Sequence, residues 1–346
     1  MPDFPYINAR VRAMRSRLLS PGRLEELLGT PTFDAFLQAL AATPYGDDLQ
    51  EALVRAQGVR AVDQALARNL QRTTRAILSF ADGGARVLLE TLLLLRWDLH
   101  NLRVIVRGKH AGRPADEIVA ALMPAGNLSE TLLKELAGHP DMAALAGTLE
   151  AVNHPLAGPL AAGVAAYAQT QDLLALELGL ERAYAVWGLA RASGRGHDAE
   201  VLREVFRTEI DAANVKTALK LALAGPVPEA RRVQFYIPGG AIVTDKLFLG
   251  LSDSQTQAAA WERLRVHGFP VKDLPGDLVA FERALDYHVV RTLVRYYLGD
   301  PLGIDIVVGF LAMKTAEVAN LRLIARGKVY GLPREQVRRE MLLVLV

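Results

Sequence analysis

Apolar residues recur every three or four positions along most of the chain, the spacing that places them on one face of an α-helix. Residues 201–223, VLREVFRTEIDAANVKTALKLAL, show the pattern clearly, and sustained strand alternation is not evident. Only RRVQFYI (231–237) and MLLVLV (341–346) favour strand, and both are short enough to be helix ends or irregular segments. The pattern predicts an all-α fold.

One helical segment occurs almost twice. Residues 98–114, DLHNLRVIVRGKHAGRP, and residues 317–333, EVANLRLIARGKVYGLP, are identical at nine of seventeen positions. A weaker third copy, DAANVKTALKLALAGPVP, occupies residues 211–228. The three copies share an acid, an Asn three residues later, and cations two and six residues after that Asn. Glycine and proline predict where the helices stop; these residues are Gly112, Pro114, Gly225, Gly331 and Pro333.

The spacing of the copies predicts three domain-sized units. Asn101, Asn214 and Asn320 lie 113 and 106 residues apart, too far for a short solenoid repeat. Two proline-centred breaks precede each Asn in the same order, at Pro21, Pro124 and Pro238 and at Pro44, Pro155 and Pro270. We expect three homologous helical units, 1–120, 121–234 and 235–346, around a pseudo-threefold axis that forms a funnel or socket. An open superhelix is the alternative.

The repeated helix has two different faces. The acid and the Asn share one face, where we expect them to bond a neighbouring helix end or loop within each unit, because buried polar groups need partners. The cations share another face and are either solvated or paired, or else converge to contact one partner. The first set is Asp98, Asn101, Asp211, Asn214, Glu317 and Asn320; the second is Arg103, Arg107, Lys216, Lys220, Arg322 and Arg326.

Composition argues against several functional classes. The 40 Lys and Arg against 38 Asp and Glu give a net charge of +2, and aromatic residues make up 6%, so nucleic-acid binding is not expected. The chain has no Cys, and its seven His are scattered without a metal motif; we interpret His100 and His110 as packing or surface residues. No phosphate loop or nucleophile elbow has the required spacing. We therefore expect no catalytic residue, cofactor or metal.

Targeting signals are likewise not evident. The first twenty residues carry four Arg where a secretory leader would be apolar, and the most apolar runs fall short of the ~20 residues that span a bilayer. We expect a protein that does not cross a membrane by itself.

Several motifs in fixed order are similar to those of the C subunit of the bacterial and archaeal V/A-type ATPases, the homologue of the eukaryotic d subunit. They are YINARVRAMRSRLL, TPYGDDL, LLLLRWDLHNLRVIVRGKHAGRP, EIDAANVKTALKL, YIPGGAIV and GDPLGIDIVVGFLAMKTAEVANLRLIARGKVYGLP, and they cover essentially the whole chain. The resemblance implies an all-helical funnel that is not an enzyme. Such a funnel lies on the cytoplasmic face of the membrane, sits on the proteolipid ring and receives the central shaft, which is made by the D and F subunits.

Two features of the sequence do not follow directly from that resemblance. The middle copy has Lys216 and Lys220 in place of the Arg pair and lacks the R-G-K ending, so the pseudo-symmetry is imperfect. The apolar end MLLVLV either packs into the fold, as we expect, or faces the ring.

The alternatives to a coupling role are a cytosolic helical adaptor unrelated to ATPases and a helical enzyme with an unrecognised pocket. A small-molecule substrate is not expected.

Overall fold

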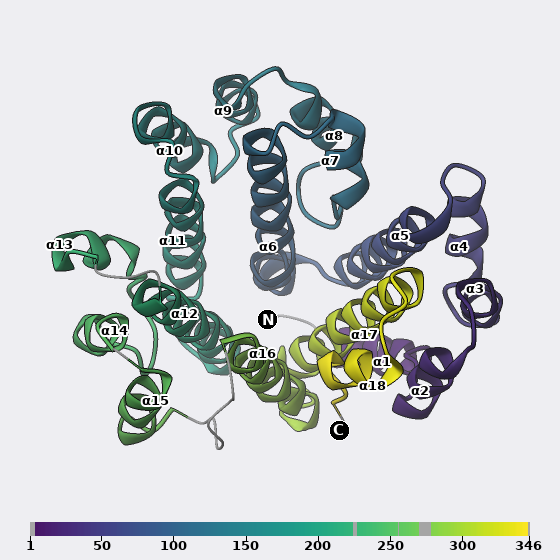
Figure 1. Cartoon of the computed structure of the whole chain (residues 1–346). Coiled ribbons are helices and arrows are strands. Elements are labelled where there is room, and N and C mark those ends of the chain that lie inside the picture. The colour runs from purple at the N-terminus through teal and green to yellow at the C-terminus, as the bar shows by residue number, and fades with distance from the viewer. Residues whose placement is uncertain (1–3, 224–226, 255, 270–277, 345–346) are drawn as a thin grey trace. The chain divides into compact units, whose positions relative to one another are not determined.

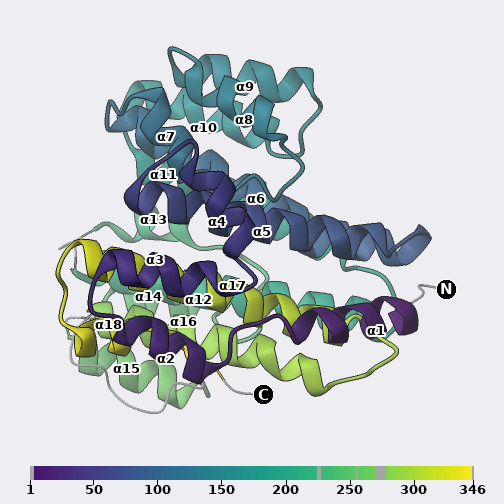
Figure 2. The same ribbon diagram turned by 90° about the vertical axis from the view of Figure 1, so that its right-hand side faces the viewer.

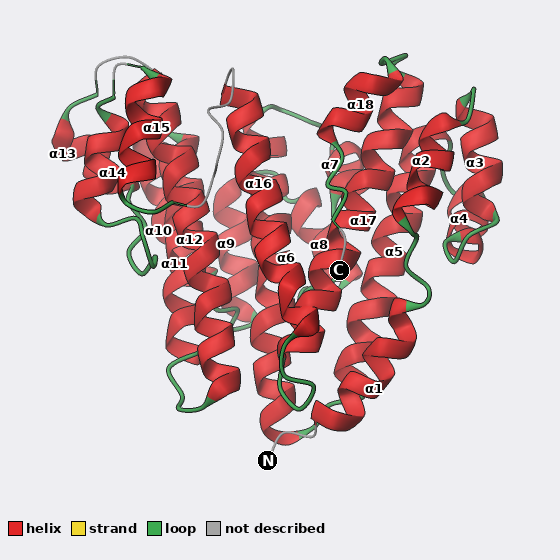
Figure 3. Ribbon diagram, turned by 90° about the horizontal axis from the view of Figure 1, so that it is seen from below, coloured by secondary structure: helices red, strands yellow, loops and turns green. Residues whose placement is uncertain are grey.

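The computed structural model describes residues 4–223, 227–254, 256–269 and 278–344. Within these ranges all regular structure is helical and no strand occurs (Figure 3), which confirms the predicted all-α fold. Val233–Phe235 is a short 3-10 helix and residues 341–344 have no regular structure, so neither strand-like segment forms a strand within the described residues. The expected stop at Gly225 and the break at Pro270 lie outside the described residues.

The helices are labelled in chain order in Figure 1. The longest are α6, α12 and α17, with 28, 27 and 25 residues, and they carry the three copies of the repeated segment. The helices are α1 (Phe4–Arg15), α2 (Pro21–Gly29), α3 (Phe33–Ala41), α4 (Gly46–Leu53), α5 (Gly58–Ser79), α6 (Gly83–His110), α7 (Ala115–Ala121), α8 (Glu130–Gly138), α9 (Met142–Ala151), α10 (Ala157–Thr170), α11 (Leu173–Arg191), α12 (His197–Leu223), α13 (Glu229–Arg232), η1 (Val233–Phe235), α14 (Asp245–Ser252), α15 (Gln257–Val266), α16 (Leu278–Arg295), η2 (Tyr296–Leu298), α17 (Asp305–Val329) and α18 (Arg334–Glu340).

The ends of these helices follow from local sequence. Gly112 and Gly331 have φ of 64° and 65°, a left-handed conformation that ends α6 and α17 with little steric cost. Pro114 and Pro333 then stand directly before α7 and α18. Hydroxyl side chains accept a backbone N–H at the start of α2, α8 and α14 and so satisfy a donor that the helix leaves free; these caps are Ser20, Ser129 and Thr244.

The described helices form two compact units. The first comprises residues 1–145 with 293–346, so both ends of the chain contribute to it, and the second comprises residues 146–292. The three-unit boundaries expected from the sequence stay a prediction.

The core of the first unit surrounds α17. This helix packs against α2, α3 and α5, and α18 packs against α2 (Figure 2). Tyr45, Phe36 and Leu321 are fully buried in this core. Met341 is only 6% exposed there and Leu343 packs against the same core, so this part of the apolar C-terminal segment packs into the fold as expected. Residues 345–346 lie outside the described residues.

The core of the second unit lies between α12, α14, α15 and α16. Phe248 and Leu285 are fully buried in it, and Trp261 meets Phe281 edge to face with ring centroids 5.7 Å apart. Aromatic pairs in this arrangement add about 0.5 to 1.5 kcal/mol to the burial of their area. This core fixes the C-terminal half of α12, where the second copy of the repeated segment lies.

Candidate functional site: three polar junctions on the long helices

On α6 the repeated Asn forms a closed pair with one backbone residue. Asn101 is fully buried. Its amide Nδ2 donates to the carbonyl of Met123 at 2.7 Å, and its Oδ1 accepts the N–H of Met123 at 2.7 Å. A carboxylate could not do both, because it carries no donor. The Asn therefore fixes the chain just after α7.

The acid one turn earlier binds the next few backbone N–H groups. Asp98 is fully buried and accepts the N–H groups of Asn127 and Leu128 at 3.1 and 3.0 Å, and also the Asn127 amide at 2.9 Å. A Cβ on Gly126 would lie 2.1 Å from an Asp98 oxygen, so only glycine lets the chain approach this closely. We call the contacts around Asp98 and Asn101 the first junction.

The second junction, on α12, has the same form. Asn214 donates to the carbonyl of Ile237 at 2.7 Å and accepts its N–H at 2.8 Å. Asp211 accepts three consecutive backbone N–H groups at 2.8 to 3.0 Å, and a Cβ on Gly240 would lie 2.1 Å from its oxygen. The donors are Ala241, Ile242 and Val243.

Burial and these donors act on Asp211 in opposite directions. Loss of water around the carboxylate raises the pKa of Asp211, whereas the three backbone N–H groups lower it, and burial is the larger effect. The hydrogen bonds thus offset part of the cost of placing a carboxylate in the core.

The third junction, on α17, closes with the beginning of the chain. Asn320 donates to the carbonyl of Leu342 at 3.0 Å and accepts its N–H at 2.7 Å. Glu317 replaces Asp, and its Oε2 accepts the N–H of Leu19. Leu19 stands two residues before Pro21, one of the three aligned prolines. In all three junctions the acceptor-only side chain therefore binds a segment beside one of the aligned prolines.

The longer Glu side chain also brings in two buried polar groups. Its Oε1 accepts the Tyr45 hydroxyl at 2.5 Å and the Lys314 ammonium at 2.9 Å, and all three residues are no more than 5% exposed. Burial lowers the pKa of Lys314, and the carboxylate of Glu317 opposes that shift. Burial and the same carboxylate both raise the pKa of Tyr45. The cluster is a buried ion pair between Lys314 and Glu317, and the Tyr45 hydroxyl donates a hydrogen bond to its carboxylate.

The expectation for the acid and Asn face matches this geometry in one respect and differs in another. The side chains do bond loops, as expected. On α6 and α12, however, the loops belong to the following predicted unit, because residues 123–128 and 237–243 lie beyond the boundaries at 120 and 234. On α17, the partner of Asn320 lies within predicted unit 3 and the partner of Glu317 lies in predicted unit 1.

A repeated lysine that the sequence pattern did not single out caps the end of a shorter helix. Lys109 donates to the carbonyls of Ala137 and His139 at the end of α8, and Lys328 donates to those of Leu28 and Thr30 at the end of α2. Cations are favourable at the end of a helix because its last carbonyls are unsatisfied. The R-G-K ending shared by two copies was the available signal.

The middle copy supplies the same cap from elsewhere. Arg232, on α13 and 8% exposed, donates to the carbonyl of Leu249 at 3.3 Å and to the Ser252 hydroxyl at 3.2 Å, at the end of α14. It also pairs with Asp253 at 3.1 Å. No spacing in the repeated segment predicts this replacement.

The glycine of R-G-K has a separate role. A Cβ on Gly108 would lie 2.5 Å from Ile118 of α7, and a Cβ on Gly327 would lie 2.5 Å from Val337 of α18. Both glycines therefore allow a short helix to cross a long helix closely.

The candidate cations make intramolecular contacts. Asp63 pairs with Arg322 at 3.2 Å and with Arg326 at 3.4 Å. In the second unit, Lys216 pairs with Asp286, and Lys220 pairs with Glu282 at 2.7 Å. Their contact with a partner protein stays a prediction.

The cationic faces of α6 and α17 meet at His100. Burial and, in decreasing order, the nearby charges of Arg322, Arg103 and Arg107 together lower the pKa of His100 to about 4. His100 is therefore neutral at pH 7. Its ring also contacts Trp97 edge to face, with centroids 5.8 Å apart, so it is a packing residue, as interpreted from the sequence.

Among the described residues, no group of three or more His, Cys, Asp or Glu is placed to hold a metal ion. None of the helices that the structure describes is both long and apolar enough to span a bilayer.

These features define a helical scaffold whose repeated polar residues join each long helix to the backbone of another segment of the chain. The model of the ATP synthase (C/AC39) subunit family matches residues 7–340, and the chain belongs to this family. The resemblance inferred from the sequence motifs is confirmed.

Individual relatives agree over nearly the whole length. The C subunit of the V-type ATP synthase of Deinococcus radiodurans is 34% identical over 343 residues, covering 99% of this chain and 92% of the relative. That of Thermus thermophilus is 35% identical and covers 98% of each chain. The C subunit of the A-type ATP synthase of Archaeoglobus fulgidus is 28% identical, covering 98% of this chain and 96% of the relative.

Proposed function

We propose that the chain is the non-catalytic coupling component of a rotary V/A-type ATPase. In this role it links the central shaft, made by the D and F subunits, to the proteolipid ring at the cytoplasmic face of the membrane. ATP hydrolysis or synthesis is thereby coupled to ion translocation. The observation that carries the proposal is the full-length similarity to the C subunits of V-type ATP synthases. A coupler needs rigid joints between helices, which the three buried junctions would provide.

The order of the junctions supports a closed pseudo-threefold funnel over an open superhelix. The first junction joins the last long helix of predicted unit 1 to the opening segment of unit 2, and the second does the same for units 2 and 3. The third joins Glu317 of unit 3 to Leu19 of unit 1. An open superhelix would leave its two terminal units unjoined.

The cationic face is the candidate contact surface for a partner. Arg103, Arg107 and Arg322 all act on His100, so the cations of two copies gather in one place in the first unit. Lys216 and Lys220 are paired with acids in the second unit, which favours unequal roles for the three copies. An asymmetric shaft would be matched by such unequal contacts.

Co-purification tests the assignment. A tagged chain expressed in its native host should recover both shaft proteins and proteolipids from solubilised membranes. Recovery of neither, while the chain remains folded, would contradict the proposal.

A charge variant tests the contact surface within that experiment. Arg107→Gln with Arg326→Gln should reduce recovery of the shaft several-fold without lowering the melting temperature, because both residues are exposed. The matched control is Arg86→Gln with Arg113→Gln, which removes two exposed charges near the two ends of α6. Equal losses in both variants would mean that the cationic face has no special role.

A further inference from the structure

A cleft in the first unit is used by none of the three junctions. It has a volume of about 160 Å³ and opens between α5 on one side and α7 and α8 on the other. Apolar side chains such as Leu122, Val119 and Leu133 form part of its wall. Its polar lining residues are Arg55, Gln64, Arg68, Gln71, Glu130 and Lys134.

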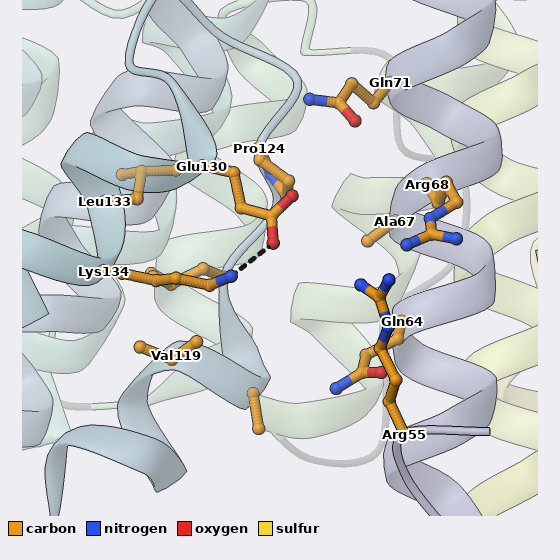
Figure 4. Close-up of a pocket in the computed structure, with 12 residues that line it drawn as sticks. Arg55, Gln64, Ala67, Arg68, Gln71, Val119, Pro124, Glu130, Leu133 and Lys134 are labelled. Atoms are coloured by element: carbon orange, nitrogen blue, oxygen red, sulfur yellow. Dashed lines mark hydrogen bonds and ion pairs between the residues drawn. The ribbon is translucent and has the colours of Figure 1, made fainter. Parts of the chain in front are cut away.

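Hydrogen-bond donors line the α5 wall in a regular stripe. Gln64, Arg68 and Gln71 are spaced by four and three residues, which places them on one face of the helix. Arg55, from the segment before α5, extends the stripe. Figure 4 shows Arg55 and Arg68 on the α5 side of the cleft and the Glu130–Lys134 pair on the opposite side.

The cations of the cleft outnumber its carboxylates. Arg68 pairs with Glu51, and Lys134 pairs with Glu130 at 2.7 Å. The guanidinium of Arg55 adds a third positive charge, which acts on Glu130 from across the cleft. The lining therefore holds three cations and one carboxylate, and Glu51, which pairs with Arg68, lies outside it.

The three cations of the cleft all act on Glu130. The hydrogen bond from Lys134 is the largest cause that lowers the pKa of Glu130; burial opposes the shift, and the charges of Lys134, Arg68 and Arg55 add to it. A carboxylate is therefore already stabilised where an incoming anion would lie.

We propose that this cleft binds a phosphate group. Cations approach from two opposite walls, which suits a tetrahedral anion that accepts hydrogen bonds in several directions, and guanidinium groups match phosphate oxygens in pairs. Pockets for drug-sized ligands measure about 300 to 1,000 Å³, so this cleft suits one phosphate with a short apolar attachment better than a whole nucleotide. The source is either free phosphate or the headgroup of an anionic lipid.

Calorimetric titration of the isolated full chain with inorganic phosphate, at low ionic strength, tests the site. Saturable binding is expected, and Arg55→Ala and Arg68→Ala should each weaken it about tenfold, as for loss of a charge-assisted hydrogen bond. Glu130→Gln should instead strengthen binding, because it removes a competing carboxylate. Melting curves check that each variant is folded.

Arg75→Ala is the matched control, since Arg75 is an exposed cation of α5 outside the cleft. Absence of saturable binding, or an equal loss in Arg75→Ala and Arg55→Ala, would overturn the proposal. A second arm adds neutral phosphatidylcholine vesicles with and without phosphatidylglycerol. Arg55-dependent binding to the anionic vesicles, reversed by free phosphate, identifies a lipid headgroup; phosphate binding without vesicle binding identifies the free ion. Both results support the site, and neither depends on assembly into an ATPase.

Discussion

The junctions on α6 and α17 place the same kind of side chain at opposite extremes of chain distance. Asp98 accepts N–H groups only 29 and 30 residues away, whereas Glu317 accepts the N–H of a residue 298 positions away. Closing the longer loop costs about 2 kcal/mol more in chain entropy, since each doubling of length adds about 0.6 kcal/mol. The third junction, which closes the longer loop and is called the closing junction below, therefore needs more stabilising free energy from its side chains.

The two junctions meet this need by different means. The first relies on shape, because Gly126 lets the backbone come within hydrogen-bond distance of Asp98. The third relies on charge, because Glu317 reaches Leu19 with one oxygen and Tyr45 and Lys314 with the other. We expect the first to be sensitive to added volume and the third to loss of charge.

Neutralising Glu317 should have the largest effect. Glu317→Gln leaves the Lys314 ammonium buried without its counter-ion, a change that costs about 3 to 5 kcal/mol. Urea unfolding of the full chain would measure the loss. Asp98→Asn is the matched variant and should cost about 1 to 3 kcal/mol, since it disturbs hydrogen bonds to backbone donors.

A second substitution separates charge from packing at the closing junction. Lys314→Met in the Glu317→Gln background should recover part of the lost stability, because it removes the stranded charge. If Glu317→Gln and Asp98→Asn cost the same, and Lys314→Met recovers nothing, the two junctions do not differ in the way described.

Adding a methyl group to a glycine should destabilise the first and second junctions more than the third. Gly126→Ala and Gly240→Ala each place a Cβ 2.1 Å from a carboxylate oxygen and should cost about 1 to 3 kcal/mol. Gly22, beside the closing junction, has its nearest neighbour, the Ser20 hydroxyl, at 3.8 Å, so Gly22→Ala should be neutral or stabilise α2 by up to ~1 kcal/mol. Thermal melting of the three variants decides the matter; a loss in Gly22→Ala as large as the others would contradict it.

The smallest effect concerns His100, where the cationic faces of α6 and α17 meet. The pKa of His100 is about 4 in the folded chain and about 6.5 when unfolded, so the unfolded state binds the extra proton and stability falls as pH drops from about 6.5 toward 4. A full shift corresponds to about 3 kcal/mol, which partial exposure of the ring reduces to on the order of 1 to 2 kcal/mol.

Substitution of the histidine isolates this contribution from that of the carboxylates. In His100→Gln the loss of stability between pH 6.5 and 4 should be smaller than in the unaltered chain, as measured by urea unfolding at several pH values. An unaltered slope in His100→Gln would exclude the effect.

Repetition in the sequence located the junction helices but not their partners. The acid and Asn of each copy could be predicted to share a face, because helical geometry alone decides that. Their partners Met123, Ile237 and Leu342 could not, since backbone groups have no sequence signal of their own. Leu19 was hardest to foresee because it lies at the other end of the chain.

The capping role of Arg232 could not be predicted from the repeated segment either, because Arg232 lies on a different helix from that segment. Arg232 caps α14 from α13, whereas Lys109 and Lys328 cap their helices from within the repeated segment. The requirement is physical, a cation at unsatisfied carbonyls, and any cation within reach can meet it. Comparing copies by sequence therefore understates how alike the junctions are.

The contact between Leu19 and Glu317 also sets an order of events during synthesis. At roughly 5 to 20 residues per second, translation across the 298 positions that separate them takes about 15 to 60 s. Throughout that time α2 and α3 have no α17 to pack against, so the apolar residues they will bury remain available to chaperones or to other chains. Residues 146–292, by contrast, are contiguous and are complete before the last helix emerges. The first unit in the sequence should thus be the last to finish folding.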